Sequence, residues 1–238
     1  MKKHADTFLE VKELGKKIPP YQPTYEFSNS YIDSYHQYLA ESPLQENTLV
    51  EVKTQKWFGK VIPGWLRRED ALKIYELSYF AKGDILELGS YHGLSTSIIA
   101  QAVCNSKQSN HLYSIDLSSR NIKAAKNNLQ AMGLDKYTTM ICDDGVKAVN
   151  DYARKKRCFD FVFIDHSHAY EPVYKVCVEL ANIMASKTFC LFHDFNDHRN
   201  SNPDDNDYGV YQAVLDGLDQ NQFEFYGIYG CTGLYRLN

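Results

Sequence analysis

The sequence predicts a doubly wound α/β domain, in which helices cover both faces of a mostly parallel sheet. From Lys56 onward, short apolar segments alternate with longer amphipathic ones, and this alternation is typical of a parallel sheet with crossover helices. The last two apolar segments, residues 222–230 and 233–238, have no helical segment between them. They therefore predict an antiparallel hairpin at the C-terminal edge of the sheet.

Each expected element follows from its own pattern. Residues 68–81 carry apolar positions at helical spacing behind an acidic first turn, which predicts a helix. Short apolar runs predict the strands, at residues 84–89, 111–117, 137–145, 159–166 and 188–195. Amphipathic segments predict the helices between and after them, at residues 95–104, 120–133, 146–155, 171–185 and 209–218.

The first 55 residues differ in composition from the rest, so we divide the chain into an N-terminal extension, 1–55, and a main domain, 56–238. The extension is rich in proline and tyrosine, and Tyr31, Tyr35 and Tyr38 have the spacing of one helix face. These rings either pack the extension onto the main domain, or form an aromatic cap over a substrate pocket or a dimer contact.

Charge and composition argue against several classes of partner. The net charge is −4 and there is no long basic run, so no nucleic-acid partner is expected. An uninterrupted apolar stretch of about 18 residues is missing, so no membrane span is expected. The N-terminus has no apolar segment typical of a secretory signal. Six widely spaced cysteines indicate reduced thiols and a cytoplasmic protein.

The turn after the first strand suggests a nucleotide other than a dinucleotide. Gly89 and Gly93 give a G-x-x-x-G spacing, whereas the dinucleotide fingerprint needs G-x-G-x-x-G and a P-loop needs a lysine. Glu87, just before the turn, repels a pyrophosphate but can hold an ammonium group or order the turn. Ser95 and the N–H groups at the helix start can take a carboxylate. The alternative for Glu87 is a local hydrogen bond in the turn.

The next two strands also end in acidic residues. Asp116 can accept hydrogen bonds from both hydroxyls of a ribose, although proteins that bind NAD use the same contact. The third strand ends in Asp143 and Asp144, where an aspartate can accept from an adenine amino group. Three acidic strand ends in order are a stronger indication of an adenosine site than any one of them.

With these motifs the sequence resembles the class I S-adenosylmethionine-dependent methyltransferases. The segments ILELGSYHGLSTSIIA, LYSIDLS and MICDDGVKAV resemble their first three motifs in order. The resemblance covers roughly residues 56–238 and implies a Rossmann-like fold with S-adenosyl-L-methionine as the cofactor. The residues that it places at the cofactor are Glu87, Gly89, Ser90, Tyr91, Gly93, Ser95, Asp116, Leu117, Asp143, Asp144 and Asp165.

Polar side chains gather at the ends of the fourth and fifth strands. They are Asp165, His166, His168 and Tyr170 after one strand, and His193, Asp194 and Asn196 after the next. Carboxylates that converge with histidine and asparagine are typical of a site for a hard cation or for proton transfer. The alternative for Asp165 and Asp194 is that they cap the following turns.

These two strand ends resemble the branch that includes the macrolide sugar O-methyltransferases and the cephalosporin hydroxylase-like proteins. The resemblance implies that Asp165 and Asp194 bind a metal ion such as Mg²⁺, with Asn196 as a less specific third ligand. It implies that His168 is the catalytic base beside Asp165. His193 stands where some members have an acidic ligand.

The sequence therefore predicts an S-adenosylmethionine-dependent methyltransferase that methylates a hydroxyl of a small molecule, of the sugar or natural-product type, with assistance from a metal. Proteins of this kind often associate, so a homo-oligomer is a further expectation. Within the same fold, an N-methyltransferase or a hydroxylase-like relative that uses the same pocket stays open. Two alternatives of other classes stay open as well. One is an NAD(P)-dependent oxidoreductase, and the other is a non-catalytic protein that binds S-adenosylmethionine as a partner of another protein.

Overall fold

A computed structural model of the chain describes residues 50–51, 61–202 and 205–238. Nearly all of the predicted N-terminal extension, including its tyrosines, lies outside the described residues. Two of its residues form strand β1, Val50–Glu51, which pairs antiparallel with β2, Val61–Ile62. The predicted boundary at residue 55 lies between these two strands in the sequence and outside the described residues.

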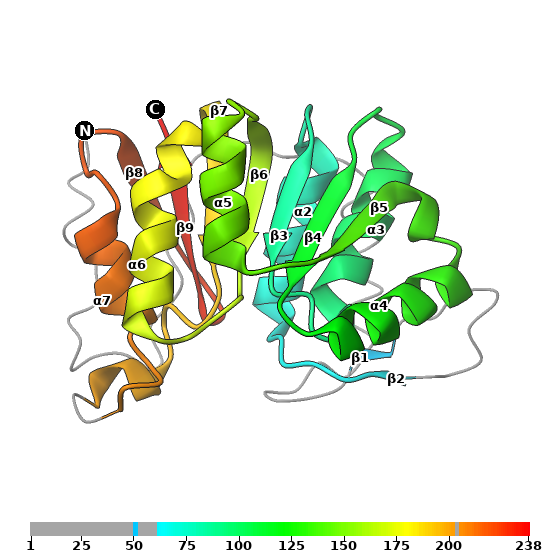
Figure 1. Cartoon of the computed structure of the whole chain (residues 1–238), viewed down its shortest axis with the longest axis horizontal. Coiled ribbons are helices and arrows are strands. Elements are labelled where there is room, and N and C mark those ends of the chain that lie inside the picture. The colour runs from blue at the N-terminus through cyan, green and yellow to red at the C-terminus, as the bar shows by residue number, and fades with distance from the viewer. Residues whose placement is uncertain (1–49, 52–60, 203–204) are drawn as a thin grey trace.

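A seven-stranded sheet forms the centre of the molecule, in the order β5-β4-β3-β6-β7-β9-β8 (Figure 1). Neighbouring strands from β5 to β7 are parallel, whereas β9 is antiparallel to both β7 and β8. The predicted doubly wound sheet with a C-terminal antiparallel hairpin is thus confirmed. Its strands are β3 (Ile85–Leu88), β4 (Leu112–Asp116), β5 (Thr138–Cys142), β6 (Phe159–Ile164), β7 (Met184–Phe192), β8 (Phe223–Tyr229) and β9 (Thr232–Leu237).

Six α-helices among the described residues cover the two faces of this sheet (Figure 1). They are α2 (Arg68–Phe80), α3 (Leu94–Ser106), α4 (Ser119–Met132), α5 (Gly145–Arg154), α6 (Tyr170–Glu179) and α7 (Val210–Gly217). Short 3₁₀ turns, η3 (Asp135–Tyr137), η4 (Leu180–Asn182) and η5 (His198–Ser201), complete the connections. Each of these helices is too short or too polar to cross a membrane.

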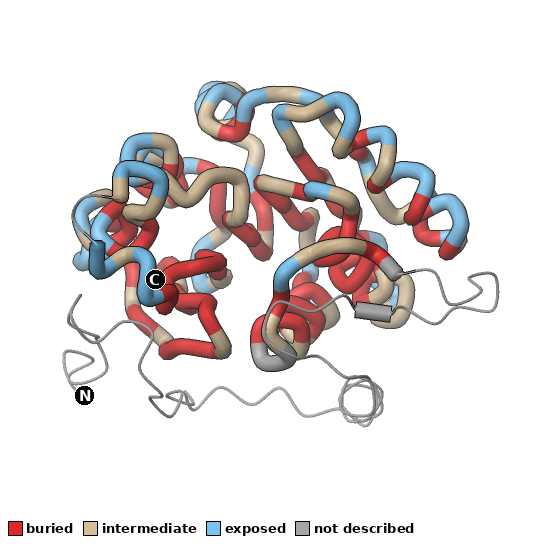
Figure 2. The backbone as a smooth tube through the Cα atoms, turned by 90° about the horizontal axis from the view of Figure 1, so that it is seen from below, coloured by how far each residue is buried: buried red, intermediate tan, exposed pale blue. Residues whose placement is uncertain are grey.

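The strands are apolar on both sides because each face of the sheet has its own core. In β3, Ile85 packs with the cluster formed by α2, α3 and α4, whereas Leu86 and Leu88 pack with the cluster formed by α5, α6 and α7. The same alternation in β6 sends Phe163 to the first cluster and Ile164 to the second. In Figure 2 the buried stretches run through the interior and the exposed ones lie on the outside.

One predicted helix is longer than the structure allows. The pattern of residues 171–185 predicts one helix, but α6 ends at Glu179 and a 3₁₀ turn follows. Met184 already belongs to β7, where it pairs with Phe159 of β6. The apolar residues of this segment suit a helix as well as a strand, so periodicity alone does not locate the change.

All six cysteines lie within the described residues and are free thiols. Cys177, Cys190 and Cys231 are buried, whereas Cys142 and Cys158 are exposed. The prediction of reduced thiols agrees with this arrangement.

Candidate active site

A cavity of about 1160 Å³ opens at the carboxyl ends of the parallel strands. Ligands of doubly wound proteins bind at this edge of the sheet. The cavity is large enough for two small molecules, since pockets for one drug-sized ligand span about 300–1,000 Å³. Its wall comes from the segments after β3, β4, β6 and β7, from residues 64–67 before α2, and from residues 197–199 and Tyr208.

The turn between β3 and α3 is built on two glycines with left-handed backbone. Gly89 has φ of 94°, and a Cβ atom there would lie 2.0 Å from the carbonyl oxygen of Asp165. Gly93, with φ of 91°, precedes α3 and would contact Ala125 of α4. The two glycines therefore allow the turn to approach the ends of neighbouring elements, with the start of α3 beside the cavity.

Glu87 lies beneath this turn and does not line the cavity. Its side chain is 0% exposed and accepts hydrogen bonds from the hydroxyls of Ser95, Thr96 and Ser114. Burial raises the pKa of Glu87 to about 7, although these three hydrogen bonds oppose the shift. Of the roles considered from the sequence, the ordering of the turn fits these contacts, and a direct contact with a cofactor ammonium does not.

Asp116 reaches from the end of β4 to the same turn. Its Oδ2 accepts a hydrogen bond of 2.8 Å from the backbone of Tyr91. Its Oδ1 accepts from the backbone of Ser118 and the side-chain amide of Asn121. Asp116 lines the cavity, as do the three residues that donate to it, Tyr91, Ser118 and Asn121. The carboxylate is thus fixed in place before any ligand binds.

Other predicted cofactor residues also line the cavity. Tyr91 is partly exposed and Leu117 is 74% exposed. Ser95 lines the wall while its hydroxyl donates to Glu87. The Ser90 hydroxyl is buried in the turn and has no hydrogen-bond partner among the described residues. An orphaned hydroxyl at this position fits a polar ligand group, as the predicted cofactor requires.

Asp143 and Asp144 do not line this cavity, so their contact with the adenine stays a prediction. Asp143 pairs with Lys147 at 2.8 Å on the surface, and this contact lowers its pKa. Asp144 is the N-cap of α5 and accepts a hydrogen bond from the backbone of Lys147. Both carboxylates therefore contact Lys147 in the first turn of α5, because the chain turns into that helix directly after β5.

The ends of β6 and β7 bring two carboxylates and a histidine together, as the sequence predicts. The Nε2 atom of His168 lies 3.0 Å from Oδ2 of Asp194 and 3.8 Å from Oδ1 of Asp165. One atom from each of the three side chains lies within 4.8 Å of the others, which is close enough to hold a metal ion. Burial would lower the pKa of His168, but the two carboxylates outweigh it and raise the pKa.

A second histidine lies behind this group. Nδ1 of His193 is 3.2 Å from Oδ1 of Asp165 and 3.4 Å from Oδ2 of Asp194. Burial opposes protonation of His193, but the surrounding carboxylates raise its pKa well above the ordinary value. The Asp194 carboxylate is partly desolvated, which opposes its ionisation, but the charge of His193 lowers its pKa far below the usual range.

Asp194 has further partners on the loop that follows it. The Tyr208 hydroxyl donates to Oδ2 of Asp194 at 3.3 Å, and the Tyr208 ring stacks on His168 with centroids 4.7 Å apart. The Arg199 guanidinium lies 3.9 Å from the centre of the Tyr208 ring. These contacts make the loop a wall of the cavity beside His168.

The structure does not bring Asn196 to this group, so its predicted role as a metal ligand lacks support from the geometry. Its side chain is buried and does not line the cavity. Its backbone N–H donates to the carbonyl of Cys231, which directs this residue toward β9. The Asp165 and Asp194 carboxylates, in contrast, lie where the sequence predicts them. His166 also lines the cavity, although its two ring nitrogens have no partner among the described residues.

Several residues of the cavity were missed by the sequence analysis. Trp65 is 59% exposed and its ring lies 5.8 Å from that of Tyr91, on the wall that both form. The tryptophan had no distinguishing signal in the sequence. Cys231 reaches the cavity from the turn between β8 and β9. No local pattern marks it, because its neighbours Asp70 and His193 are distant in the sequence.

Comparisons with known proteins agree with this fold. Residues 86–195 match the family model of a methyltransferase domain. No curated protein matches the sequence. A candidate O-methyltransferase from Klebsiella pneumoniae is 16% identical, with a TM-score of 0.59 over 89% of this chain and 91% of that chain.

Two further solved structures cover nearly the whole chain. An O-methyltransferase from Bacillus cereus, solved with SAH, is 14% identical with a TM-score of 0.58 over 90% of this chain and 94% of that chain. The O-methyltransferase TomG from Streptomyces achromogenes is involved in tomaymycin synthesis and was solved with SAM. It is 15% identical, with a TM-score of 0.57 over 91% of this chain and 92% of that chain.

The matched region begins in β3 and ends just after β7, so it contains the glycine turn, Asp116, and the Asp165 and Asp194 carboxylates. The structural neighbours share the fold of this chain at low identity. Together with the motif order and the cavity at the strand ends, the match over residues 86–195 identifies a methyltransferase domain in this part of the chain.

Proposed function

We propose that this enzyme methylates a hydroxyl group of a small molecule, with His168 as the base. The observation that carries the proposal is the position of the His168 imidazole. It is 41% exposed, lines the cavity, and lies against Asp194 at 3.0 Å. A histidine that is both accessible and fixed by a carboxylate suits the removal of a proton from a bound acceptor.

The cofactor is proposed to lie along the β3 and β4 ends of the cavity. Asp116 is the candidate partner of the ribose hydroxyls, and the glycine turn with Ser90 and Ser95 is the candidate partner of the amino-acid end. Tyr91 and Leu117 supply the apolar surface. S-adenosylmethionine supplies a methyl group on a positively charged sulfur. Glu87 acts indirectly in this proposal, since it holds the Ser95 side chain from below.

The acceptor is proposed to occupy the part of the cavity between Trp65 and Tyr208. Both rings line it, and Tyr208 stacks on the proposed base. Flat aromatic walls favour an acceptor with a ring, such as a sugar or a polycyclic natural product. Two of the structural neighbours described above are O-methyltransferases, which agrees with a hydroxyl acceptor.

A divalent cation is included in the proposal as an aid to the acceptor. The carboxylates of Asp165 and Asp194 converge and fit a cation such as Mg²⁺, with the imidazole of His168 beside them. A cation held there would lower the pKa of an acceptor hydroxyl. Arg199 lies 3.9 Å from Asp194 and supplies a fixed positive charge close to the same carboxylate.

The test is release of S-adenosylhomocysteine in the presence of a panel of hydroxylated sugars and phenols, with and without Mg²⁺. We expect turnover with at least one class of hydroxyl acceptor. Loss of turnover on chelation, restored by Mg²⁺, would support the cation. Methylation of amines but of no hydroxyl would contradict the proposed acceptor, whereas binding of S-adenosylhomocysteine without turnover of any acceptor would contradict the proposed base.

A further inference from the structure

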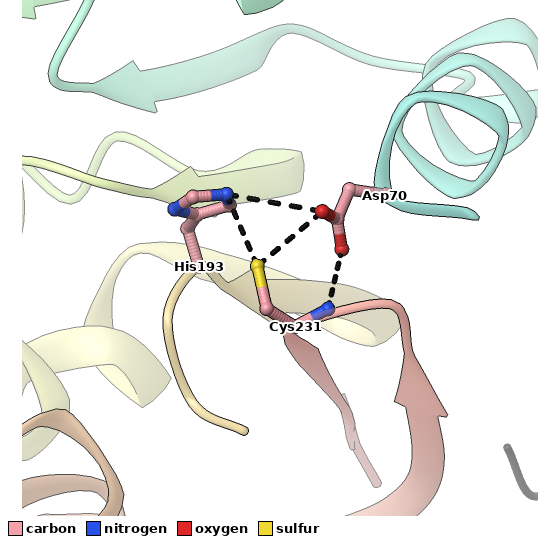
Figure 3. A group of neighbouring side chains, drawn as sticks. All are labelled: Asp70, His193 and Cys231. Atoms are coloured by element: carbon pink, nitrogen blue, oxygen red, sulfur yellow. Dashed lines mark hydrogen bonds and ion pairs between the residues drawn. The ribbon is translucent and has the colours of Figure 1, made fainter. Parts of the chain in front are cut away.

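A second group of ligand-type side chains lies beside the cavity and is used by none of the proposed steps. Asp70 comes from the first turn of α2, His193 follows β7, and Cys231 lies in the turn between β8 and β9. Figure 3 shows the three side chains pointing toward one another from these separate elements. All three are buried, with exposed fractions of 0%, 6% and 4%.

The ligand atoms form a triangle. The Cys231 sulfur lies 3.3 Å from Nε2 of His193 and 3.3 Å from Oδ2 of Asp70. Nε2 of His193 and Oδ2 of Asp70 are 3.9 Å apart. Tetrahedral zinc, with bonds of about 2.0–2.3 Å, separates its nitrogen, oxygen and sulfur ligands by roughly 3.4–3.6 Å. Each side of the triangle is within about half an ångström of that range.

We propose that Asp70, His193 and Cys231 bind a zinc-class divalent cation, with its fourth position toward the cavity. One sulfur, one imidazole nitrogen and one carboxylate oxygen form a donor set that suits zinc better than magnesium. Two of the three ligands, His193 and Cys231, line the cavity, which gives the cation a path of entry. A site with three protein ligands keeps one position for water or for an acceptor atom.

Hydrogen bonds hold Asp70 in place, and a carboxylate lies within ion-pair distance of the far nitrogen of His193. The other oxygen of Asp70, Oδ1, accepts from the backbone N–H groups of Cys231 and Thr232. Gly230 permits this approach, because a Cβ atom there would lie 2.5 Å from Oδ1 of Asp70. The other nitrogen of His193, Nδ1, faces Oδ1 of Asp165 at 3.2 Å. A carboxylate behind a metal-binding histidine fixes its orientation and increases its basicity.

Binding of the cation must displace protons from this group. Without a metal, burial and Asp70 raise the pKa of Cys231 to about 12. The thiol and the protonated Nε2 of His193 therefore each lose a proton to solvent as the sulfur–metal and nitrogen–metal bonds form. Oδ2 of Asp70 also accepts a hydrogen bond from the backbone N–H of Arg67, and the cation then replaces the charge of protonated His193 beside this carboxylate.

The test uses the purified full-length chain, freed of metal with a chelator and titrated with Co²⁺ as a spectroscopic substitute for Zn²⁺. We expect a thiolate-to-cobalt absorption band at one equivalent, lost on addition of Zn²⁺. Cys231→Ser should abolish the band and weaken Zn²⁺ binding by more than about 100-fold. This exceeds the loss typical of changing a residue that contacts a metal ligand but not the metal itself. Cys158→Ser, which removes an exposed thiol outside the cavity, should keep it.

A second variant separates this site from the proposed magnesium site. His168→Gln removes a member of the Asp165 and Asp194 group and should lower turnover by about 10²–10⁴-fold while the cobalt band stays. If Cys231→Ser does not fold, X-ray absorption of the zinc-loaded wild type serves instead and should show one sulfur at about 2.3 Å. No thiolate band in the wild type, or a band that persists in Cys231→Ser, would show that the three residues form a hydrogen-bonded cluster only.

Discussion

The imidazole Nε2 of His168 lies 3.0 Å from the carboxylate oxygen Oδ2 of Asp194. This contact joins the loop after β6 to the end of β7. The two residues are 26 positions apart, and adjacent parallel strands bring them to one edge of the sheet. The pair gives the cavity a histidine with a fixed orientation. Four predictions follow from this site and from the turn that faces it.

The first prediction concerns the proposed base. His168→Gln should lower kcat by about 10²–10⁴-fold, because that is the usual contribution of a general base. Binding of S-adenosylhomocysteine, measured by calorimetry, should change little, since His168 is proposed to face the acceptor. His111→Gln is the matched control, because that histidine contacts Thr139 at the edge of the sheet, away from the cavity. Unchanged kcat in His168→Gln would refute the assignment.

The second prediction distinguishes two acidic strand ends. Asp116→Ala should weaken S-adenosylhomocysteine binding by about 10- to 150-fold, since hydrogen bonds to a charged group contribute about 1.5–3 kcal/mol. Asp143→Ala should have a much smaller effect, because Asp143 lies outside the cavity and pairs with Lys147. Calorimetry of both variants checks this. A larger loss in Asp143→Ala would restore the adenine contact that the sequence suggested.

The third prediction concerns Glu87 and pH. Its pKa is about 7 in the folded chain against an ordinary value of 4.5, so the folded state holds its proton more tightly than the unfolded state. Stability from this group is therefore present below about pH 4.5 and is lost as the pH rises to 7. The shift corresponds to about 3 kcal/mol, at 1.36 kcal/mol for each pKa unit.

Glu87→Gln should remove this dependence, because the amide keeps hydrogen-bond partners without a charge. Urea unfolding of both proteins between pH 5 and 8 measures the difference. The free energy of unfolding of Glu87→Gln should rise relative to that of the wild type as the pH rises. Glu171→Gln, a change in a surface pair with Lys175, should show no such gain beyond the 0.3–0.5 kcal/mol of such pairs. A constant difference between Glu87→Gln and wild type across this range would contradict the shifted pKa.

The fourth prediction uses two glycines with similar backbone. Gly89→Ala should destabilise the fold by about 2–5 kcal/mol, because left-handed backbone costs about 1–2 kcal/mol and overpacking about 1–3 kcal/mol. Gly133→Ala should cost only about 1–2 kcal/mol, since its φ of 70° is similar but no atom lies within 4 Å of the added Cβ. Chemical denaturation compares the two. Equal costs would mean that the turn can move away from Asp165.

Much of the fold could be predicted from the sequence because its signals are local. Apolar strands with amphipathic helices between them fix the doubly wound sheet, and the two final strands without a helix fix the antiparallel hairpin. The glycine turn and the acidic residues at the ends of β3 and β4 were also readable. Each of these features depends on the residues of one short segment. The same is true of the change in the spacing of apolar residues from the period of a strand to that of a helix.

Only the tertiary structure decided which of these residues face the cavity. Glu87 ends a strand like Asp116, yet Ser95, Thr96 and Ser114 enclose it beneath the turn. Side chains on a strand alternate between the two faces, and the packing of α3 determines what meets each one. Asp143 likewise follows a strand, β5 at the edge of the sheet, but pairs with Lys147 of α5.

The group of Asp70, His193 and Cys231 depends wholly on the strand order. Asp70 and Cys231 are separated by 161 positions and meet because β9 inserts between β7 and β8. The sequence by itself determined the elements, their order and the residues at each strand end. The choice of partners across the sheet was left to the packing, because contacts between distant segments depend on burial of the whole core and not on any local pattern.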